Sequence, residues 1–265
     1  MIICRLDGEM ATAPTLQPIL QFLDEMDMPQ LRRAAQDFRY LLARGYPRQA
    51  GLTLVGNRYQ LTGAARQILH RGVFDPEVSA QRRLKLRPVG DLSGRSLALD
   101  GHNVVITLES ALRGIPVTAA DDGFIRDIGQ ISHTFRPSPL TEQALKLLGG
   151  YLAGKGVGPV LFWYDAPMSR SGELAALTRS MLQACGVAGE AQAVTVPEKE
   201  LLKCEGAIGS SDTYLIDRAG VVVDVAGEII RQRHDGRIIA LNPADRGKQV
   251  ISGNLKQNDL TAEKI

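Results

Sequence analysis

The chain has 265 residues, of which 44% are hydrophobic and 23% are charged, as in an ordinary globular protein. This length accommodates one large domain, or a small domain and a medium one. No apolar stretch is long enough to cross a bilayer, and the first residues lack the apolar core of a secretion signal. We therefore expect a cytoplasmic protein with no membrane partner, and we interpret its three scattered cysteines as reduced apolar residues.

The net charge of +2 hides a strong asymmetry along the chain. Residues 30–90 hold twelve Lys and Arg, eleven of them Arg, against three acids, whereas the remainder holds nineteen basic and twenty-six acidic residues. Such segregation favours a segment that attracts a polyanion, because the planar guanidinium group matches phosphate with two parallel hydrogen bonds. A solvated basic surface that binds nothing is the plainer alternative.

The spacing of apolar residues predicts mainly helical structure over residues 1–90, which we expect to form a basic domain. The expected elements are helices over 16–27, 30–43 and 63–70, a turn with partly extended flanks over 52–61, and a basic connector over 75–95. Thr62 is expected to cap the third helix. The arginines that we expect to contact nucleic acid are Arg32, Arg39, Arg58, Arg82, Arg83 and, further along the chain, Arg170.

After residue 94 the pattern changes to alternating strands and helices. Strands are expected over 96–100, 116–120, 159–164, 190–196, 206–210 and 221–225, and helices over 104–112, 141–153, 172–184, 213–219 and 227–232. The continuous apolar run at 159–164 is typical of a central strand buried on both faces. This order predicts an α/β domain over residues 91–235, with a mainly parallel sheet and helices on both faces. Residues 236–265 are expected to be an extension that becomes a loose tail beyond about residue 254.

Three of the expected strands run directly into an aspartate, namely Asp100, Asp165 and Asp212. The carboxyl ends of parallel strands share one edge of a sheet, where ligands of such folds bind. Converging carboxylates repel one another unless a cation lies between them, and oxygen ligands suit Mg²⁺ or Mn²⁺. The sequence therefore predicts a divalent-metal site here. Each aspartate could instead cap the helix that follows it.

Other polar residues near these strand ends are less specific. Asn103 can hold Asp100 or reach the metal, and His102 is either a general base or an exposed histidine without a catalytic task. Asp122 is our candidate for a fourth metal ligand, with Asp121 in an ordinary turn and Glu109 on the following helix as alternatives. Arg170 is either a phosphate clamp or an ordinary surface arginine.

The segment LALDGHNVV (97–105) resembles the first strand and helix of PIN-like and NYN nuclease domains, where a strand ends in Asp-Gly-X-Asn. The segment AIGSSDTYLIDRAGVVVDVAGEII (207–230) resembles the closing pattern of that superfamily. The resemblance covers about residues 95–232 and implies a Rossmann-like nuclease that uses one or two divalent cations, usually on RNA. It implicates Asp100, Asp165 and Asp212 as catalytic metal ligands and Asn103 as a supporting group. The helical acid of the superfamily has no clear match.

The whole chain also resembles a prokaryotic group known as domain of unknown function 434, through the segment LRRAAQDFRYLLARGYPRQAGLTLVGNRYQLTGAARQILHRGV (31–73). Our leading hypothesis is a ribonuclease-like enzyme that uses Mg²⁺ or Mn²⁺ and whose basic domain contacts RNA phosphates. A catalytically silent RNA-binding protein of the same fold and a metal-dependent phosphatase of small phosphates are the rival hypotheses. A homo-oligomer is left open.

Overall fold

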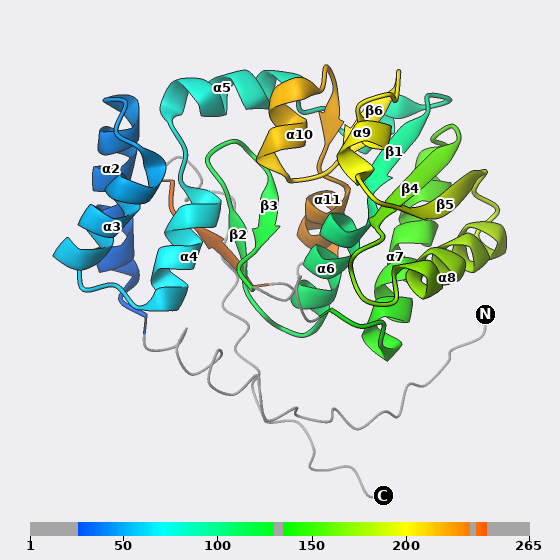
Figure 1. Cartoon of the computed structure of the whole chain (residues 1–265), viewed down its shortest axis with the longest axis horizontal. Helices are drawn as coiled ribbons and strands as arrows, with labels where there is room; N and C mark the ends of the chain where they lie inside the picture. Colours follow the sequence, from blue (N-terminus) through cyan, green and yellow to red (C-terminus); the bar gives the residue numbers. More distant parts are fainter. Residues whose placement is uncertain (1–25, 130–134, 234–236, 243–265) are drawn as a thin grey trace, which may run out of the picture.

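The computed structural model describes residues 26–129, 135–233 and 237–242, and its largest sheet has five parallel strands in the order β5–β4–β1–β6–β7 (Figure 1). The strands are β1 (Leu97–Asp100), β4 (Val160–Asp165), β5 (Gly189–Val194), β6 (Ala207–Gly209) and β7 (Val222–Val223). The predicted α/β architecture with a mainly parallel sheet is confirmed. The run at 159–164 forms β4, which lies inside the sheet between β5 and β1 as expected of a central strand, but it buries only alternate residues, so the predicted burial on both faces is wrong.

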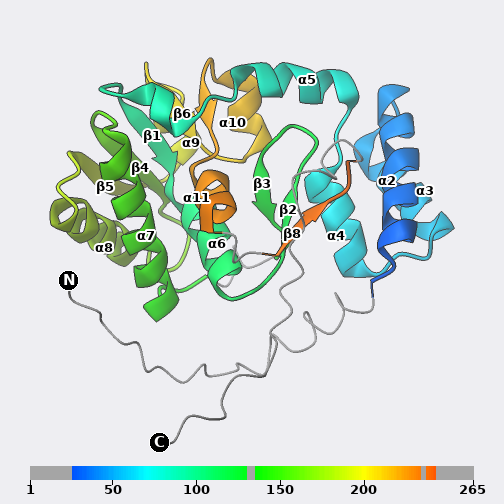
Figure 2. The ribbon, with the colours of Figure 1, turned by 180° about the vertical axis from the view of Figure 1, so that it is seen from behind.

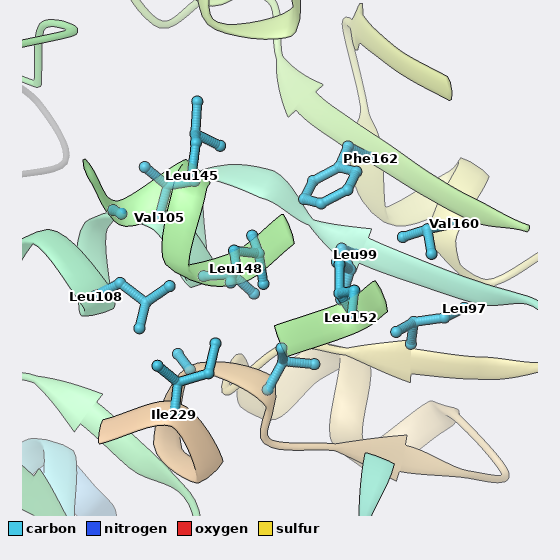
Figure 3. Packing of buried hydrophobic residues seen from close by; sticks show 14 of the residues in the cluster. Leu97, Leu99, Val105, Leu108, Leu145, Leu148, Leu152, Val160, Phe162 and Ile229 are labelled. Atoms are coloured by element: carbon cyan, nitrogen blue, oxygen red, sulfur yellow. The ribbon is translucent and has the colours of Figure 1, made fainter. Parts of the chain in front are cut away.

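The helices predicted in the α/β domain are all present, with small shifts at their ends. Among the described residues, four of them cover one face of this sheet. They are α6 (Gly101–Leu112), α7 (Pro139–Lys155), α8 (Ser171–Ala184) and α11 (Val225–Arg233). Alternate strand residues point toward them, because successive side chains of a strand face opposite sides. Figure 3 shows this core, in which Leu97, Leu99 and Phe162 of the sheet pack among leucines of α6 and α7.

The other face of the sheet carries the short helices α9 (Pro197–Leu201) and α10 (Thr213–Arg218). Ala98, Ile208 and Val222 are buried there against Leu201 and Leu215. Both faces are therefore covered near the middle of the sheet. None of the helices in the described ranges is long and apolar enough to cross a membrane.

In the part of the chain that the structure describes, four α-helices precede the sheet: α2 (Met28–Ala43), α3 (Arg48–Arg58), α4 (Gly63–Gly72) and α5 (Pro76–Lys85). α2 confirms the helix predicted over 30–43, and α4 confirms the helix over 63–70, where the Thr62 hydroxyl accepts a hydrogen bond from the Ala65 backbone N–H as expected for a cap. The helix expected over 16–27 and the tail beyond residue 254 lie outside the described residues, apart from residues 26 and 27, which precede α2.

Two predictions about the N-terminal segment are wrong. Residues 52–61, expected to be a turn, belong largely to α3, because Leu52 and Val55 lie one turn apart and both enter the apolar core. Gly51 permits this packing, since a Cβ atom there would come within 3.2 Å of the Phe38 ring. The basic connector over 75–95 contains α5 and a short 3₁₀ turn at Val89–Leu92. Asp75 caps α5 and is followed by proline, a start signal that was visible in the sequence.

A second, smaller sheet links the two parts of the chain. It consists of β2 (Val117–Ala119), flanked by antiparallel β3 (Ile125–Asp127) and parallel β8 (Ile238–Ala240). The strand predicted over 116–120 therefore exists but does not join the main sheet. β8 lies in the segment expected to be an extension, and Ile239 packs into the core of the N-terminal helices.

Buried ion pairs join the N-terminal helices to the α/β domain, with α5 running from the region of α2 to α10 (Figures 1 and 2). The Arg82 guanidinium lies 2.7 Å from Asp217 and 3.1 Å from Asp122, and Asp122 also accepts from Arg126 at 2.7 Å. Burial alone would raise the pKa of Asp122, but the charges of Arg126 and Arg82 outweigh burial and hold this pKa below its usual value. Asp122 is thus a structural counter-ion.

Two further pairs connect the same parts of the molecule. Arg39 forms a two-pronged contact with Asp121, both distances being 2.7 Å, and Arg71 lies 2.8 Å from Asp127. Acids of the α/β domain therefore neutralise part of the excess positive charge of residues 30–90. Only the remaining part is available to bind a polyanion.

We expect Asp122→Asn to lower the free energy of unfolding by about 3 kcal/mol or more, because Arg82 and Arg126 would lose a buried counter-charge. Urea unfolding monitored by circular dichroism measures this loss. The control is Glu173→Gln, which removes an exposed pair with Arg170 and should cost less than about 1 kcal/mol. Equal losses in the two variants would show that the buried pairs do not hold the two parts together.

Candidate functional site

The three predicted aspartates line one cleft at the carboxyl edge of the main sheet. Asp100 ends β1, Asp165 ends β4, and Asp212 follows β6 directly before α10. The cleft has a volume of about 610 Å³ and is also lined by residues of α4, α6, α9 and β3. Counted along the chain, the strands of the sheet stand in the order 3-2-1-4-5, so β1 and β6 flank the point where the order reverses. This is the position at which open α/β sheets bind ligands.

Asp100 is held at the floor of this cleft by uncharged donors. Its Oδ1 accepts from the Asn103 backbone N–H at 3.3 Å, and its Oδ2 accepts from the Ser210 hydroxyl at 2.9 Å. Burial raises the pKa of Asp100 to about 6, and the negative charges of Asp212 and Glu198 act in the same direction. No arginine or lysine of the described residues forms an ion pair with this carboxylate, so its charge is poorly compensated.

Asn103 fastens the start of α6 to the loop after β6. Its side-chain oxygen accepts from the Ser211 backbone N–H at 2.9 Å and from the Ser211 hydroxyl at 3.1 Å. The Asn103 side chain therefore positions the loop that carries Asp212. Gly101 allows the required close packing, since a Cβ atom there would come within 2.2 Å of the Tyr164 ring.

The alternative that the aspartates are helix caps holds for two of the three. Asp100 caps α6, and the Asp212 carboxylate accepts from the backbone N–H of Tyr214 at 2.7 Å at the start of α10. Both also line the cleft, so capping and cleft-lining are combined in the same side chains. Asp165 caps no helix, because α8 starts after Arg170, and its pKa is raised by burial and by the charge of Glu198.

His102 is buried, with 6% of its surface exposed, and the expectation of an exposed histidine is wrong. Its Nδ1 accepts from the Asp165 backbone N–H at 3.1 Å, which assigns the ring proton to Nε2. Burial between the rings of Tyr164 and Phe135 lowers the pKa of His102 to about 4. His102 is therefore neutral at neutral pH, and its one basic nitrogen is occupied in positioning the chain at Asp165.

The structure does not bring the candidates for a fourth acid into the cleft. Asp122 is fully buried between Arg82 and Arg126, and Asp121 is paired with Arg39. Glu109 accepts from Arg113, from the Ser138 hydroxyl and, at 2.7 Å, from the Thr141 hydroxyl. These contacts hold the start of α7 against α6, because Ser138 and Thr141 form the capping box of α7.

Several of the arginines that we expected to contact nucleic acid are engaged within the protein. Arg39 and Arg82 are paired with aspartates, Arg170 lies 2.5 Å from Glu173, and Arg83 donates to the Asp121 carbonyl. Arg58 is 71% exposed and lies 3.6 Å from Asp37. Arg32 is half-buried on α2, and no ion pair involving it is found among the described residues.

Two acids of the cleft were missed by the sequence analysis. Glu198 lies in α9, four residues after the end of β5. The aspartates were singled out because each directly follows a predicted strand, and a search that included the next few residues would have found Glu198 as well. Asp127 ends β3, a strand that the sequence analysis did not predict. Gln67, His70 and Arg71 reach the cleft from α4, which no pattern in the sequence indicated.

The oxygen ligands of the cleft suit a hard divalent cation, but their spacing limits how it could bind. In residues 26–129, 135–233 and 237–242, no group of three or more His, Cys, Asp or Glu side chains lies close enough to hold one metal ion. As the side chains stand, an ion would therefore contact at most two carboxylates directly and the others through water. Mg²⁺ keeps several waters in many protein sites.

Comparisons with known proteins place this chain in a family. The family model described as "Domain of unknown function (DUF5616)" matches residues 89–228. The chain belongs to this family. The model described as "Protein of unknown function (DUF434)" matches residues 30–85, so the resemblance to that group is confirmed for the N-terminal helices and does not extend to the whole chain.

The DUF5616 match covers the sheet and the whole set of cleft aspartates. A protein of Methanocaldococcus jannaschii named "Uncharacterized protein MJ0935" is 31% identical over 203 residues, which are 76% of this chain and 96% of that protein. No solved structure gives a significant match.

The raised pKa of Asp100 predicts a pH-dependent effect of Asp100→Asn. A carboxyl group whose pKa is higher in the folded than in the unfolded state destabilises the fold above its folded pKa, and the cost fades as the pH falls toward the unfolded value. In metal-free buffer at pH 7.5 we expect Asp100→Asn to raise the Tm by roughly 3–6 °C. This gain should shrink as the pH falls from 6 to 4. Calorimetric scans of both proteins across this range test it, and a gain independent of pH would mean that Asp100 carries no uncompensated charge.

Proposed function

We propose that this protein is a divalent-metal-dependent phosphodiester hydrolase that acts on RNA, with an α/β domain of the PIN-like type. One observation carries the proposal: carboxylates at the ends of three separate strands line a single cleft at the reversal point of the sheet, and no Arg or Lys of the described residues forms an ion pair with the half-buried Asp100. Such a site is electrostatically incomplete without a cation.

Asp100 and Asp212 are the residues that would hold the metal on one side of the cleft, with Asp165 and Glu198 opposite, in part through water. A bound divalent ion supplies a water of lowered pKa and neutralises charge on the phosphate. The residues of the chain orient this region. Ser210 donates to Asp100, and Asn103 fixes the loop that carries Asp212.

The cleft opens between the α/β domain and the N-terminal helices, so a chain of nucleotides could lie across it with phosphates toward α4. Gln67, His70 and Arg71 of α4 form that wall. Contacts to the backbone would position RNA without reading its sequence. The sequence prediction of a basic RNA contact is retained for Arg32 and Arg58, whereas Arg39, Arg82, Arg83 and Arg170 make contacts within the protein.

A catalytically silent RNA-binding protein of the same fold is the second candidate. The observation in its favour is the lack, among the described residues, of three potential ligands close enough to share one ion. Metal binding separates the two functions, because only the hydrolase requires a divalent ion at the aspartates.

We expect single-stranded RNA to be hydrolysed in the presence of Mn²⁺ or Mg²⁺ and to remain intact in EDTA. Asp100→Asn and Asp165→Asn should each reduce the rate by about a hundredfold or more, since each removes a negative charge that would face the ion. Gel analysis of a labelled oligoribonucleotide measures the rates, and isothermal titration measures Mn²⁺ binding to the same proteins.

The matched control is Glu205→Gln, which changes an exposed carboxylate before β6, at the opposite edge of the sheet. Its rate should equal that of the wild type. RNA binding without hydrolysis and without Mn²⁺ binding would favour the silent protein. An equal loss of rate in Glu205→Gln would remove the aspartates from the proposal.

A further inference from the structure

A second cleft, of about 340 Å³, adjoins the acidic one and is rich in arginine, with Asp75 and Asp212 also in its lining. Four arginines line it, from α3, α4, α5 and β3, together with the loop at residues 211–213: Arg48, Arg71, Arg82 and Arg126. His70, Arg71 and Asp212 line both clefts, so the two are continuous. The basic cleft has room for a phosphate group and several waters, at roughly 30 Å³ for each water.

Three of these arginines are matched by carboxylates and one is not. Arg71 pairs with Asp127, while Arg82 and Arg126 share Asp122. Arg48 has no carboxylate within ion-pair distance among the described residues. It donates to the His70 carbonyl, and its guanidinium lies over the rings of Phe38 and Phe74, 5.4 and 4.5 Å from the ring centres.

The surroundings of Arg48 are electropositive. Burial, followed by the charges of Arg126 and Arg82, lowers the pKa of Arg48 to about 10, and the charges of Asp122 and Asp121 offset this only in part. The neighbouring His70 has its pKa lowered by burial and by the charges of Arg48 and Arg71. An anion in this cleft would relieve the repulsion among the arginines.

We propose that the basic cleft binds a phosphate group of a single-stranded nucleic acid, with Arg48 as its principal contact. The inference rests on the proposed function, because the phosphate concerned would be a neighbour of the one hydrolysed in the adjoining acidic cleft. A guanidinium packed over two aromatic rings and hydrogen-bonded to a backbone carbonyl is held in one place, which suits two-pronged binding of the oxygens of a phosphate. The path of the strand is then fixed, since the bound segment runs from Arg48 in one cleft to Asp165 in the other.

The test measures binding in EDTA, where hydrolysis is excluded and a missing metal site cannot affect the result. The full-length protein is titrated with a fluorescein-labelled oligouridylate, and affinity is recorded by anisotropy at several salt concentrations. We expect Arg48→Ala to weaken binding about tenfold and to reduce the log–log salt slope by about one. Arg48→Lys keeps the charge but loses the two-pronged geometry, so its affinity should lie between that of the wild type and that of Arg48→Ala.

Arg95→Ala is the control, because Arg95 is exposed just before β1 at the opposite edge of the sheet. Asp100→Asn should bind at least as tightly as the wild type in EDTA, so loss of hydrolysis and loss of phosphate binding are measured separately. A second readout requires no folded variant: inorganic phosphate should raise the Tm of the wild type above that in chloride of equal ionic strength. The same affinity and salt slope in Arg48→Ala and Arg95→Ala, or no effect of phosphate on the Tm, would overturn the proposal.

Discussion

The structure depends on one buried electrostatic constraint, the pairing of Asp122 with Arg82 and Arg126. Asp122 lies in the turn between β2 and β3, Arg82 on α5 of the N-terminal helices, and Arg126 on β3. Arg82 also reaches Asp217 on α10, so a single side chain connects the helices, the small sheet and the helix that follows Asp212. Because unpaired buried charges are costly, these elements are held in one arrangement, and both clefts are formed between them.

This arrangement places uncompensated charges of opposite sign beside one another. The carboxyl edge of the main sheet gathers Asp100, Asp165 and Asp212, and the N-terminal helices bring Arg48 to the adjoining cleft. A ligand that carries phosphate together with a divalent ion complements both clefts, whereas a purely cationic or purely anionic ligand complements one. The charge asymmetry of the sequence therefore has two parts: one is neutralised by ion pairs inside the protein, and the other remains open at the clefts.

The sequence predicted those features that depend on local patterns. Apolar runs marked the ends of β1, β4 and β6, and the geometry of parallel sheets then brought their aspartates into one cleft. Pairs such as Arg82–Asp217, separated by 135 positions, follow from tertiary packing and have no local signal. For this reason Asp122 was taken for a metal ligand and Arg82 for a phosphate contact, although each neutralises the other. α3 was missed because its helical form depends on packing against Phe38, and Arg48 was overlooked with it.

The central claim is that a divalent cation binds where the three strands end. Anomalous X-ray scattering from a crystal of the wild-type protein soaked in Mn²⁺ tests it most directly, because it locates the ion without requiring activity. The account predicts a peak in the acidic cleft, within direct or water-mediated reach of Asp100, Asp165 and Asp212. A soaked crystal that shows no peak there, with all three carboxylates ordered, would contradict it.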